Sequence, residues 1–162
     1  MILENYQVYA RQKQIDLRFI PAETVIHMDF VPEYLRKIIR NLLSNAIKFT
    51  LKGGQITVTL VREKNKLVIR VTDTGCGISA ENLPHIFDMF YQGEESGLNI
   101  GTGIGLSLVK QMTECMEGEV YVVSTKGKGS VFTVALPLYH RNSTGEKWVP
   151  EGEGLVGPYF NV

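Results

Sequence analysis

The sequence predicts an α/β domain, because helix and strand patterns alternate along residues 1–140. Apolar residues recur at helical spacing over 33–49 and again over 106–116. Between these segments lie short runs rich in β-branched and apolar residues, which favour strands. A chain of 162 residues, 44% of them hydrophobic, has the size of about one domain and buries roughly 70% of its unfolded surface.

Six short runs are expected to form strands, and turn residues separate them. Pro21 divides the first two runs, residues 63–65 join the third and fourth, and residues 126–129 join the last two. Pro32 suits the first turn of the helix over 33–49, and Gly118 ends the helix over 106–116. The expected strands are residues 15–20, 25–28, 55–62, 66–72, 119–124 and 130–136.

Composition narrows the classes of function. Seventeen basic and seventeen acidic side chains give zero net charge, whereas nucleic-acid binders usually carry a basic surplus. No apolar run approaches the ~18 residues of a membrane span, and the amino terminus lacks a signal-peptide core. Cys76 and Cys115 have no metal-binding spacing. We therefore expect a soluble, reduced, cytoplasmic domain with no nucleic-acid partner and no direct membrane contact.

The helix over 33–49 carries polar residues along one edge of its apolar stripe. At ~100° per residue, Asn41, Asn45 and Lys48 lie together on that edge. They could be ordinary residues at the border of a buried face. They also suit a site for a polyphosphate and magnesium, because an amide oxygen is a hard ligand for Mg²⁺ and a lysine offers a point charge to phosphate. From the helix alone both interpretations stay open.

The strand over 67–72 leads directly into Asp73-Thr74-Gly75-Cys76-Gly77. A carboxylate at this strand end can accept a hydrogen bond from the exocyclic amine of adenine, whereas guanine presents an oxygen there. Glycines beside it allow sharp turns and close approach of a flat ligand. The tripeptide could also simply turn the chain. An aspartic protease needs two such carboxylates on a nearly all-β fold, in which the helix over 33–49 has no place.

A glycine-rich segment follows. Seven glycines lie between Gly75 and Gly105, and positions 71–109 contain no Lys or Arg. Such a segment within a compact domain is typical of a functional lid or a disordered loop. Its end, residues 101–106 (GTGIGL), precedes a helix and offers backbone N–H groups to an anion. It is neither a Walker loop nor a dinucleotide-binding fingerprint.

Taken in order, these motifs resemble those of sensor histidine kinases. Residues 41–50 (NLLSNAIKFT) resemble the N box and residues 73–79 (DTGCGIS) the first glycine box. Residues 86–92 (IFDMFYQ) resemble the phenylalanine box, 101–108 (GTGIGLSL) the second glycine box, and 129–137 the closing strand. The resemblance covers about residues 3–138. It implies the ATP-binding catalytic domain of the gyrase, heat-shock chaperone, histidine kinase and MutL superfamily, with a Bergerat-type α/β sandwich of five mixed strands on three helices.

The resemblance also implies roles for individual residues. Asn45, helped by Asn41, would ligate Mg²⁺, and Lys48 would contact phosphate. Asp73 would bind the adenine amine. Residues 79–104 would form the ATP lid, anchored by Phe87 and Phe90. The other residues implied to bind ATP are Phe49, Gly75, Gly77, Tyr91, Gln92, Gly101, Thr102, Gly103, Gly105 and Leu106.

By this resemblance the chain is one half of an enzyme, the half that binds MgATP. Its phosphoacceptor lies on a separate histidine-bearing dimerisation domain, and none of His27, His85 and His140 has the sequence context of that acceptor. The resemblance therefore implies a piece of a longer, membrane-tethered protein-histidine kinase that works with a response regulator or receiver domain. Residues 1–12 would end a connecting helix, 13–139 would form the catalytic domain, and 140–162 would form a linker or tail.

Two departures from the family pattern affect the expected activity. Gln92 stands where many members carry a basic residue, so we expect weak affinity for ATP and a lid that stays disordered without a partner. Asn41 stands where water-hydrolysing relatives carry a carboxylate, and an amide cannot act as a base, so hydrolysis should be slow. A non-enzymatic nucleotide sensor and a serine kinase acting on an anti-anti-sigma protein are the alternatives on the same fold.

Overall fold

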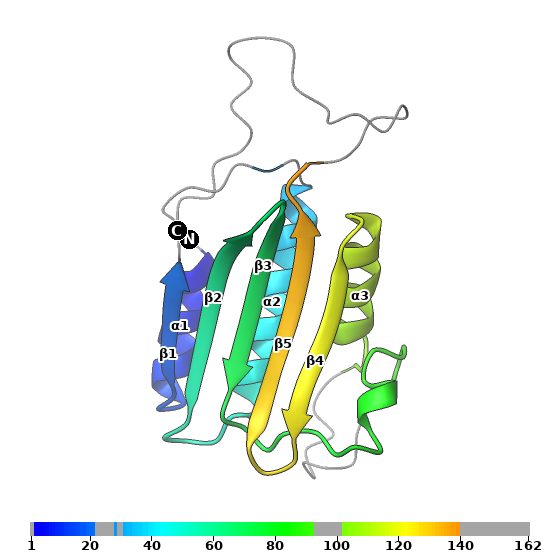
Figure 1. Cartoon of the computed structure of the whole chain (residues 1–162). Helices are drawn as coiled ribbons and strands as arrows, with labels where there is room; N and C mark the ends of the chain where they lie inside the picture. The colour runs from blue at the N-terminus through cyan, green and yellow to red at the C-terminus, as the bar shows by residue number, and fades with distance from the viewer. Residues whose placement is uncertain (1, 22–27, 29–30, 93–101, 140–162) are drawn as a thin grey trace.

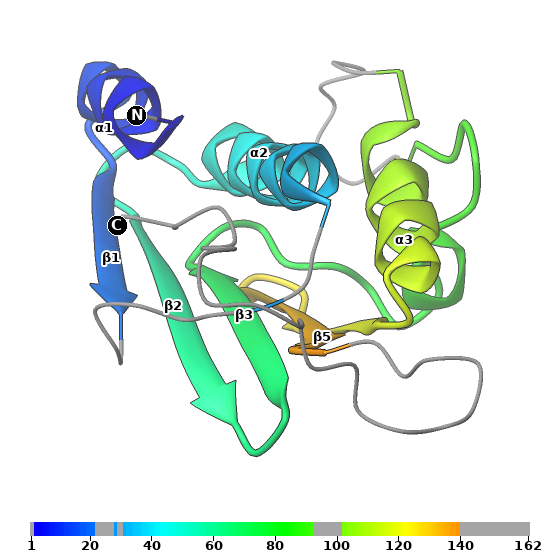
Figure 2. The same ribbon diagram turned by 90° about the horizontal axis from the view of Figure 1, so that it is seen from above.

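Three helices cover one face of a five-stranded mixed sheet (Figures 1 and 2). The structure, a computed structural model, describes residues 2–21, 28, 31–92 and 102–139. In chain order the elements are α1 (Ile2–Gln12), β1 (Asp16–Pro21), α2 (Pro32–Phe49), β2 (Gln55–Glu63), β3 (Lys66–Asp73), the 3₁₀ helix η1 (Leu83–His85), α3 (Gly105–Cys115), β4 (Glu119–Thr125) and β5 (Gly129–Pro137).

The sheet has the strand order β1-β2-β3-β5-β4. β1 runs parallel to β2, and the other neighbouring strands are antiparallel. The predicted α/β sandwich with a mixed sheet is confirmed, and five of the predicted strands agree with the structure to within a residue. The strand expected over 25–28 lies outside the described residues apart from Met28, which is buried but not in a strand.

The core lies between the sheet and the helices. The apolar stripe of α2 is buried, with Ile38, Leu43 and Ile47 fully inaccessible. It packs on inward-facing residues of the central strands, such as Ile56 and Ile69. This packing fixes the rotation of α2 about its axis, because a helix with one apolar face has only one way to bury it. The polar edge of α2 is therefore fixed as well.

Helix α1 shares this core. Ala10 is fully buried, and the Tyr6 hydroxyl donates to the carbonyl of Arg40, 3.4 Å away. Directly after α1, the Lys13 ammonium donates to the carbonyl of Ile47 at 2.9 Å. Helix α1 therefore packs with the rest of the domain. The boundary between a connecting helix over 1–12 and a catalytic domain over 13–139 stays a prediction. In the described ranges, no helix has the length and apolar character that a membrane span requires.

One buried hydroxyl in α3 lacks a hydrogen-bond partner within the described structure, that of Thr113. An unpaired buried hydroxyl costs about 1–3 kcal/mol, and valine has nearly the same shape. We expect Thr113→Val to raise the free energy of unfolding by about 1 kcal/mol in urea denaturation. The same change at the exposed Thr72 should alter stability by less than about 0.5 kcal/mol. A clear loss of stability in Thr113→Val would contradict this expectation.

Candidate nucleotide-binding site

A buried carboxylate ends the central strand β3. Asp73 is only 6% exposed, and its Oδ1 accepts a hydrogen bond from the Gly75 N–H at 2.8 Å. Burial raises the pKa of Asp73 above its ordinary value, and backbone hydrogen bonds from Gly75 and Ser130 partly offset that rise. A desolvated acceptor at the end of a strand can bind an amine donor strongly, since few water molecules compete for it.

The glycines after Asp73 allow the chain to cross the end of α2. A Cβ at Gly75 would clash with the carbonyl of Phe49 and lie 2.8 Å from Asp73 Oδ1. The Cys76 N–H donates to the same Phe49 carbonyl at 3.2 Å. Gly77 has φ +66°, and a Cβ there would clash with the carbonyl of Thr125. The structure thus brings the predicted site residues Phe49, Asp73, Gly75 and Gly77 together.

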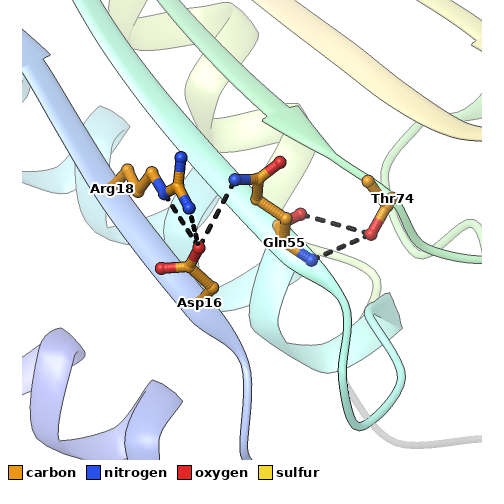
Figure 3. A network of polar contacts seen from close by, with 4 residues as sticks. All are labelled: Asp16, Arg18, Gln55 and Thr74. Atoms are coloured by element: carbon orange, nitrogen blue, oxygen red, sulfur yellow. Dashed lines mark hydrogen bonds and ion pairs between the residues drawn. The ribbon is translucent and has the colours of Figure 1, made fainter.

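A polar network holds the other side of this turn (Figure 3). Thr74 Oγ1 accepts the Gln55 N–H at 2.9 Å, and the Thr74 N–H donates to the Gln55 carbonyl at 3.1 Å. The Gln55 side chain donates to Asp16 at 3.4 Å, and the Arg18 guanidinium binds the same carboxylate at 2.7 Å. Thr74, the residue next to Asp73, is therefore held against the beginning of β2.

The polar edge of α2 faces the beginning of α3. A Cβ at Gly105 would lie 3.2 Å from Asn41 Oδ1, and Figure 2 shows the two helices side by side. Asn41 Nδ2 donates to the carbonyl of Lys37 at 2.8 Å, which leaves its oxygen directed toward α3. Asn45 and Lys48 follow on the same edge and are half-buried. Burial lowers the pKa of Lys48, whose ammonium lies 4.6 Å from the centre of the Phe49 ring.

The first turn of α3 supplies backbone donors. No side chain caps this helix at Ile104, so its first N–H groups are available to an anion. Gly105 and Leu106 are half-buried, Thr102 is exposed, and Gly101 lies outside the described residues. Asn41 and the α3 N-terminus therefore adjoin each other, although they lie more than sixty positions apart in the chain.

The described first part of the predicted lid forms turns around η1. The Tyr91 hydroxyl donates to Asn82 Oδ1 at 2.6 Å, and His85 Nδ1 lies 3.0 Å from an Asp88 carboxylate oxygen. Gln92 is exposed. Residues 93–101, the middle of the lid segment predicted over 79–104, lie outside the described residues, as do His27, His140 and the predicted tail over 140–162.

The two phenylalanines of this segment differ in their surroundings. Phe87 is partly buried and packs on the core, as an anchor should. The Phe90 side chain is 67% exposed, so it does not anchor the segment. The backbone does so instead, because the Phe90 N–H donates to the Gly103 carbonyl at 2.9 Å. A Cβ at Gly103 would lie 2.7 Å from the Phe90 carbonyl carbon, which explains the glycine.

Two serines next to the site were missed by the sequence reasoning. Ser130 pairs with Asp73 in the β3–β5 ladder, and Ser124 pairs with Ser130 in the β4–β5 ladder. Their hydroxyl oxygens are 2.9 Å apart. The alternation of residues 130–136 placed Ser130 on the same face as Phe132, but only strand pairing shows that this face reaches Asp73.

The comparisons with known proteins agree with this geometry. A family model described as "Histidine kinase-, DNA gyrase B-, and HSP90-like ATPase" matches residues 30–140. The chain belongs to this family. Its ATPase domain contains the buried carboxylate, the polar edge of α2 and the N-terminus of α3 described above, and the resemblance to histidine kinase motifs is confirmed.

The chain is similar to several sensor histidine kinases. It is 39% identical over 160 residues to sensor histidine kinase RcsC of Escherichia coli K12, covering 96% of this chain and 16% of RcsC. It is also 39% identical over 128 residues to the circadian input-output histidine kinase CikA of Synechococcus elongatus, covering 78% of this chain and 17% of CikA. The chain thus spans about a sixth of the length of these relatives.

Solved structures give the same result for the fold. Full-length ShkA in complex with AMPPNP superposes with a TM-score of 0.75 at 27% identity, over 84% of this chain and 28% of ShkA. The catalytic domain of histidine kinase ThkA superposes with a TM-score of 0.75 at 24% identity, over 85% of this chain and 88% of that domain. Together with the family match and the relatives, this identifies the chain as an ATP-binding catalytic domain of the sensor histidine kinase type.

Proposed function

We propose that the domain binds MgATP and presents its γ-phosphate to a histidine on a separate dimerisation domain. The observation that carries the proposal is the juxtaposition of three features: the buried Asp73, the polar edge of α2 and the N-terminus of α3. Together they offer a hydrogen-bond acceptor for adenine, hard oxygen ligands and a cation for Mg²⁺-triphosphate, and backbone N–H groups for phosphate. Phosphoryl transfer depends largely on such positioning and charge neutralisation.

Each predicted site residue has a proposed part in this reaction. Asn45 and Asn41 would hold Mg²⁺, since an amide oxygen lies among the ligands this ion accepts. The ion, when bound, would neutralise charge on the triphosphate. Lys48 would contact phosphate, and Asp73 would accept the adenine amine. The remaining proposed contacts with ATP are Phe49, Gly75, Gly77, Phe87, Phe90, Tyr91, Gln92, Gly101, Thr102, Gly103, Gly105 and Leu106.

The nucleophile and the later acceptor would come from outside this domain. The proposed partners are the histidine-bearing dimerisation domain of the same parent kinase and, after it, a response regulator or receiver domain. The relatives support this assignment by their descriptions as sensor histidine kinases. Hydrolysis by the domain alone should be slow, because Asn41, an amide, stands one turn before Asn45 and cannot activate water.

A phosphotransfer assay tests the proposal directly. The 162-residue chain is incubated with γ-labelled ATP, Mg²⁺ and a helical dimerisation domain that bears the acceptor histidine. Acid-labile label on histidine supports the proposal. Acid-stable label on a serine substrate would favour a serine kinase, and binding of ATP without transfer to any acceptor would favour a nucleotide sensor. Either of these two results would overturn the proposed reaction while leaving the nucleotide site intact.

The proposed magnesium ligand gives a separate test. Asn45→Ala removes one hard oxygen ligand, so we expect the affinity for MgATP to fall about tenfold or more. The affinity for ATP measured without Mg²⁺ should change little. Isothermal titration calorimetry with and without the cation measures both values. Asn5→Ala is a matched control, because Asn5 is an exposed asparagine in helix α1. Equal losses with and without Mg²⁺ would contradict the ligand role of Asn45.

A further inference from the structure

We propose that Ser124 is a positioning residue that links Asp73, the proposed adenine-binding carboxylate, to Ile78, the residue directly before the predicted lid segment. Its hydroxyl contacts Ser130, the strand partner of Asp73, and accepts the N–H of Ile78, the residue directly before the segment 79–104. The inference rests on the proposed function, because it concerns how Ser124 affects ATP binding. Ser124 would act through the positions of Asp73 and Ile78 and not through a contact with ATP.

The sheet places the three polar residues in one row. Ser124 lies opposite Ser130 in the β4–β5 pair, and Ser130 lies opposite Asp73 in the β3–β5 pair. All three lie on the helix-covered face of the sheet, since they alternate in phase with core residues such as Val122, Phe132 and Val71. The row crosses the end of the sheet at which Asp73 ends its strand.

The Ser124 hydroxyl uses all of its hydrogen-bonding capacity. It donates to the Gly129 carbonyl at 2.9 Å and accepts the Ile78 N–H at 2.8 Å. Its oxygen also lies 2.9 Å from Ser130 Oγ. A hydroxyl has one proton and two lone pairs, so with its proton on Gly129, Ser124 accepts the proton of Ser130. This arrangement fixes the side chain of Ser130, the residue that lies opposite Asp73 in the β3–β5 ladder.

The hairpin itself does not need this hydroxyl. β4 and β5 already form a continuous antiparallel ladder from Glu119 to Thr125, and the Lys128 N–H closes the turn on the Thr125 carbonyl at 3.0 Å. The bond from Ile78 instead comes from outside the hairpin, from the chain that follows Asp73. Its effect is to hold Ile78 at a fixed place relative to Asp73. The two glycines of the site, Gly75 and Gly77, lie between these two residues in the chain.

The test compares Ser124→Ala and Ser124→Thr in the 162-residue chain. We expect Ser124→Ala to weaken MgATP binding about fivefold to tenfold in calorimetry, because it removes the hydrogen bonds of the Ser124 hydroxyl with Ile78 and Ser130. We also expect the Ile78 amide to exchange with solvent about tenfold faster or more in NMR. Ser124→Thr keeps the hydroxyl and suits a strand, so it should restore both quantities to within about twofold.

A control variant separates positioning from simple weakening of β4. Val123→Ala changes the neighbouring side chain, which is 66% exposed, and lowers the β-propensity of the same strand. It should lower the melting temperature yet leave ATP affinity and Ile78 exchange unchanged. If Val123→Ala reduces ATP affinity as much as Ser124→Ala at an equal loss of stability, the inference is wrong.

The remaining outcomes distinguish this inference from the proposed function. A chain that binds ATP equally well with and without the Ser124 hydroxyl overturns the inference alone. A chain that binds no ATP before any substitution overturns the proposed function and the inference with it. A loss of ATP affinity in Ser124→Ala, rescued in Ser124→Thr and absent in Val123→Ala, supports both.

Discussion

Asp73→Asn should remove the preference of the domain for ATP over GTP and weaken ATP binding by about ten- to a hundredfold. A hydrogen bond from the adenine amine to a carboxylate is worth about 1.5–3 kcal/mol, as for other hydrogen bonds to charged groups. An amide that turns its NH₂ group toward the adenine amine places two donors against each other. Calorimetric titrations with ATP and GTP at saturating Mg²⁺ measure both effects.

The same substitution should not destabilise the fold at neutral pH. Burial raises the pKa of Asp73 in the folded state, so the folded protein prefers the protonated acid more than the unfolded chain does. Ionisation of Asp73 therefore costs stability, a cost that is absent below the unfolded-state pKa and develops as the pH rises through the folded-state pKa. We expect Asp73→Asn to unfold with equal or higher free energy at pH 7, and this advantage should shrink under acidic conditions.

The ATP affinity of the unsubstituted domain should rise with pH, whereas the contribution of Asp73 to folding stability falls. The amine of adenine needs the carboxylate form of Asp73 as its acceptor, so ATP affinity should fall as the pH drops through the raised pKa of Asp73. Asp73→Asn should lack this fall, which separates it from the titration of ATP itself. Glu63→Gln is a suitable control, because it changes an exposed carboxylate that pairs with Arg70 at 2.7 Å. Undiminished ATP selectivity in Asp73→Asn would refute the adenine contact.

The second large effect is expected at Gly77. Gly77→Ala places a methyl group against the Thr125 carbonyl at a backbone φ of +66°. The left-handed conformation costs about 1–2 kcal/mol for an L-residue, and overpacking typically adds about 1–3 kcal/mol. We expect a total loss of about 2–5 kcal/mol in the free energy of unfolding, measured by urea denaturation, together with loss of ATP binding.

Gly127→Ala is the matched control for this substitution. Gly127 has a similar φ of +79°, but a Cβ there would have nothing within 4 Å. The variant should therefore lose only the conformational part, about 1–2 kcal/mol. The difference between the two variants isolates the contact between the loop after Asp73 and the β4–β5 hairpin. Equal losses in the two variants would mean that this contact is not tight.

The parts of the structure that depend on local patterns could be predicted from the sequence. The apolar stripe of α2 fixed both its burial and the position of Asn41 and Lys48, because helical geometry relates them directly. Asp73 at the end of a strand was equally a local feature. The pairing of β5 between β3 and β4 is not local, and no residue pattern indicated which strand would lie beside Asp73.

The rest of the site depends on that non-local pairing. Ser124 and Ser130 are ordinary strand residues until the ladders place them in a row with Asp73. Phe90 shows the reverse problem: the resemblance to the phenylalanine box implied an anchoring ring, whereas its backbone N–H makes the contact and the ring is exposed. Side-chain character predicts burial only on average, whereas a backbone N–H needs a partner whatever side chain its residue carries.

The contact between Lys13 and the carbonyl of Ile47 has a mechanical consequence. Ile47 immediately precedes Lys48, so a single hydrogen bond of 2.9 Å connects the end of α1 to the backbone that carries the proposed phosphate cation. In the middle of α1, the Tyr6 hydroxyl contacts the carbonyl of Arg40, the residue before Asn41. A movement of α1 would therefore be transmitted, within one residue, to Asn41 and Lys48, the two residues proposed to contact Mg²⁺-triphosphate.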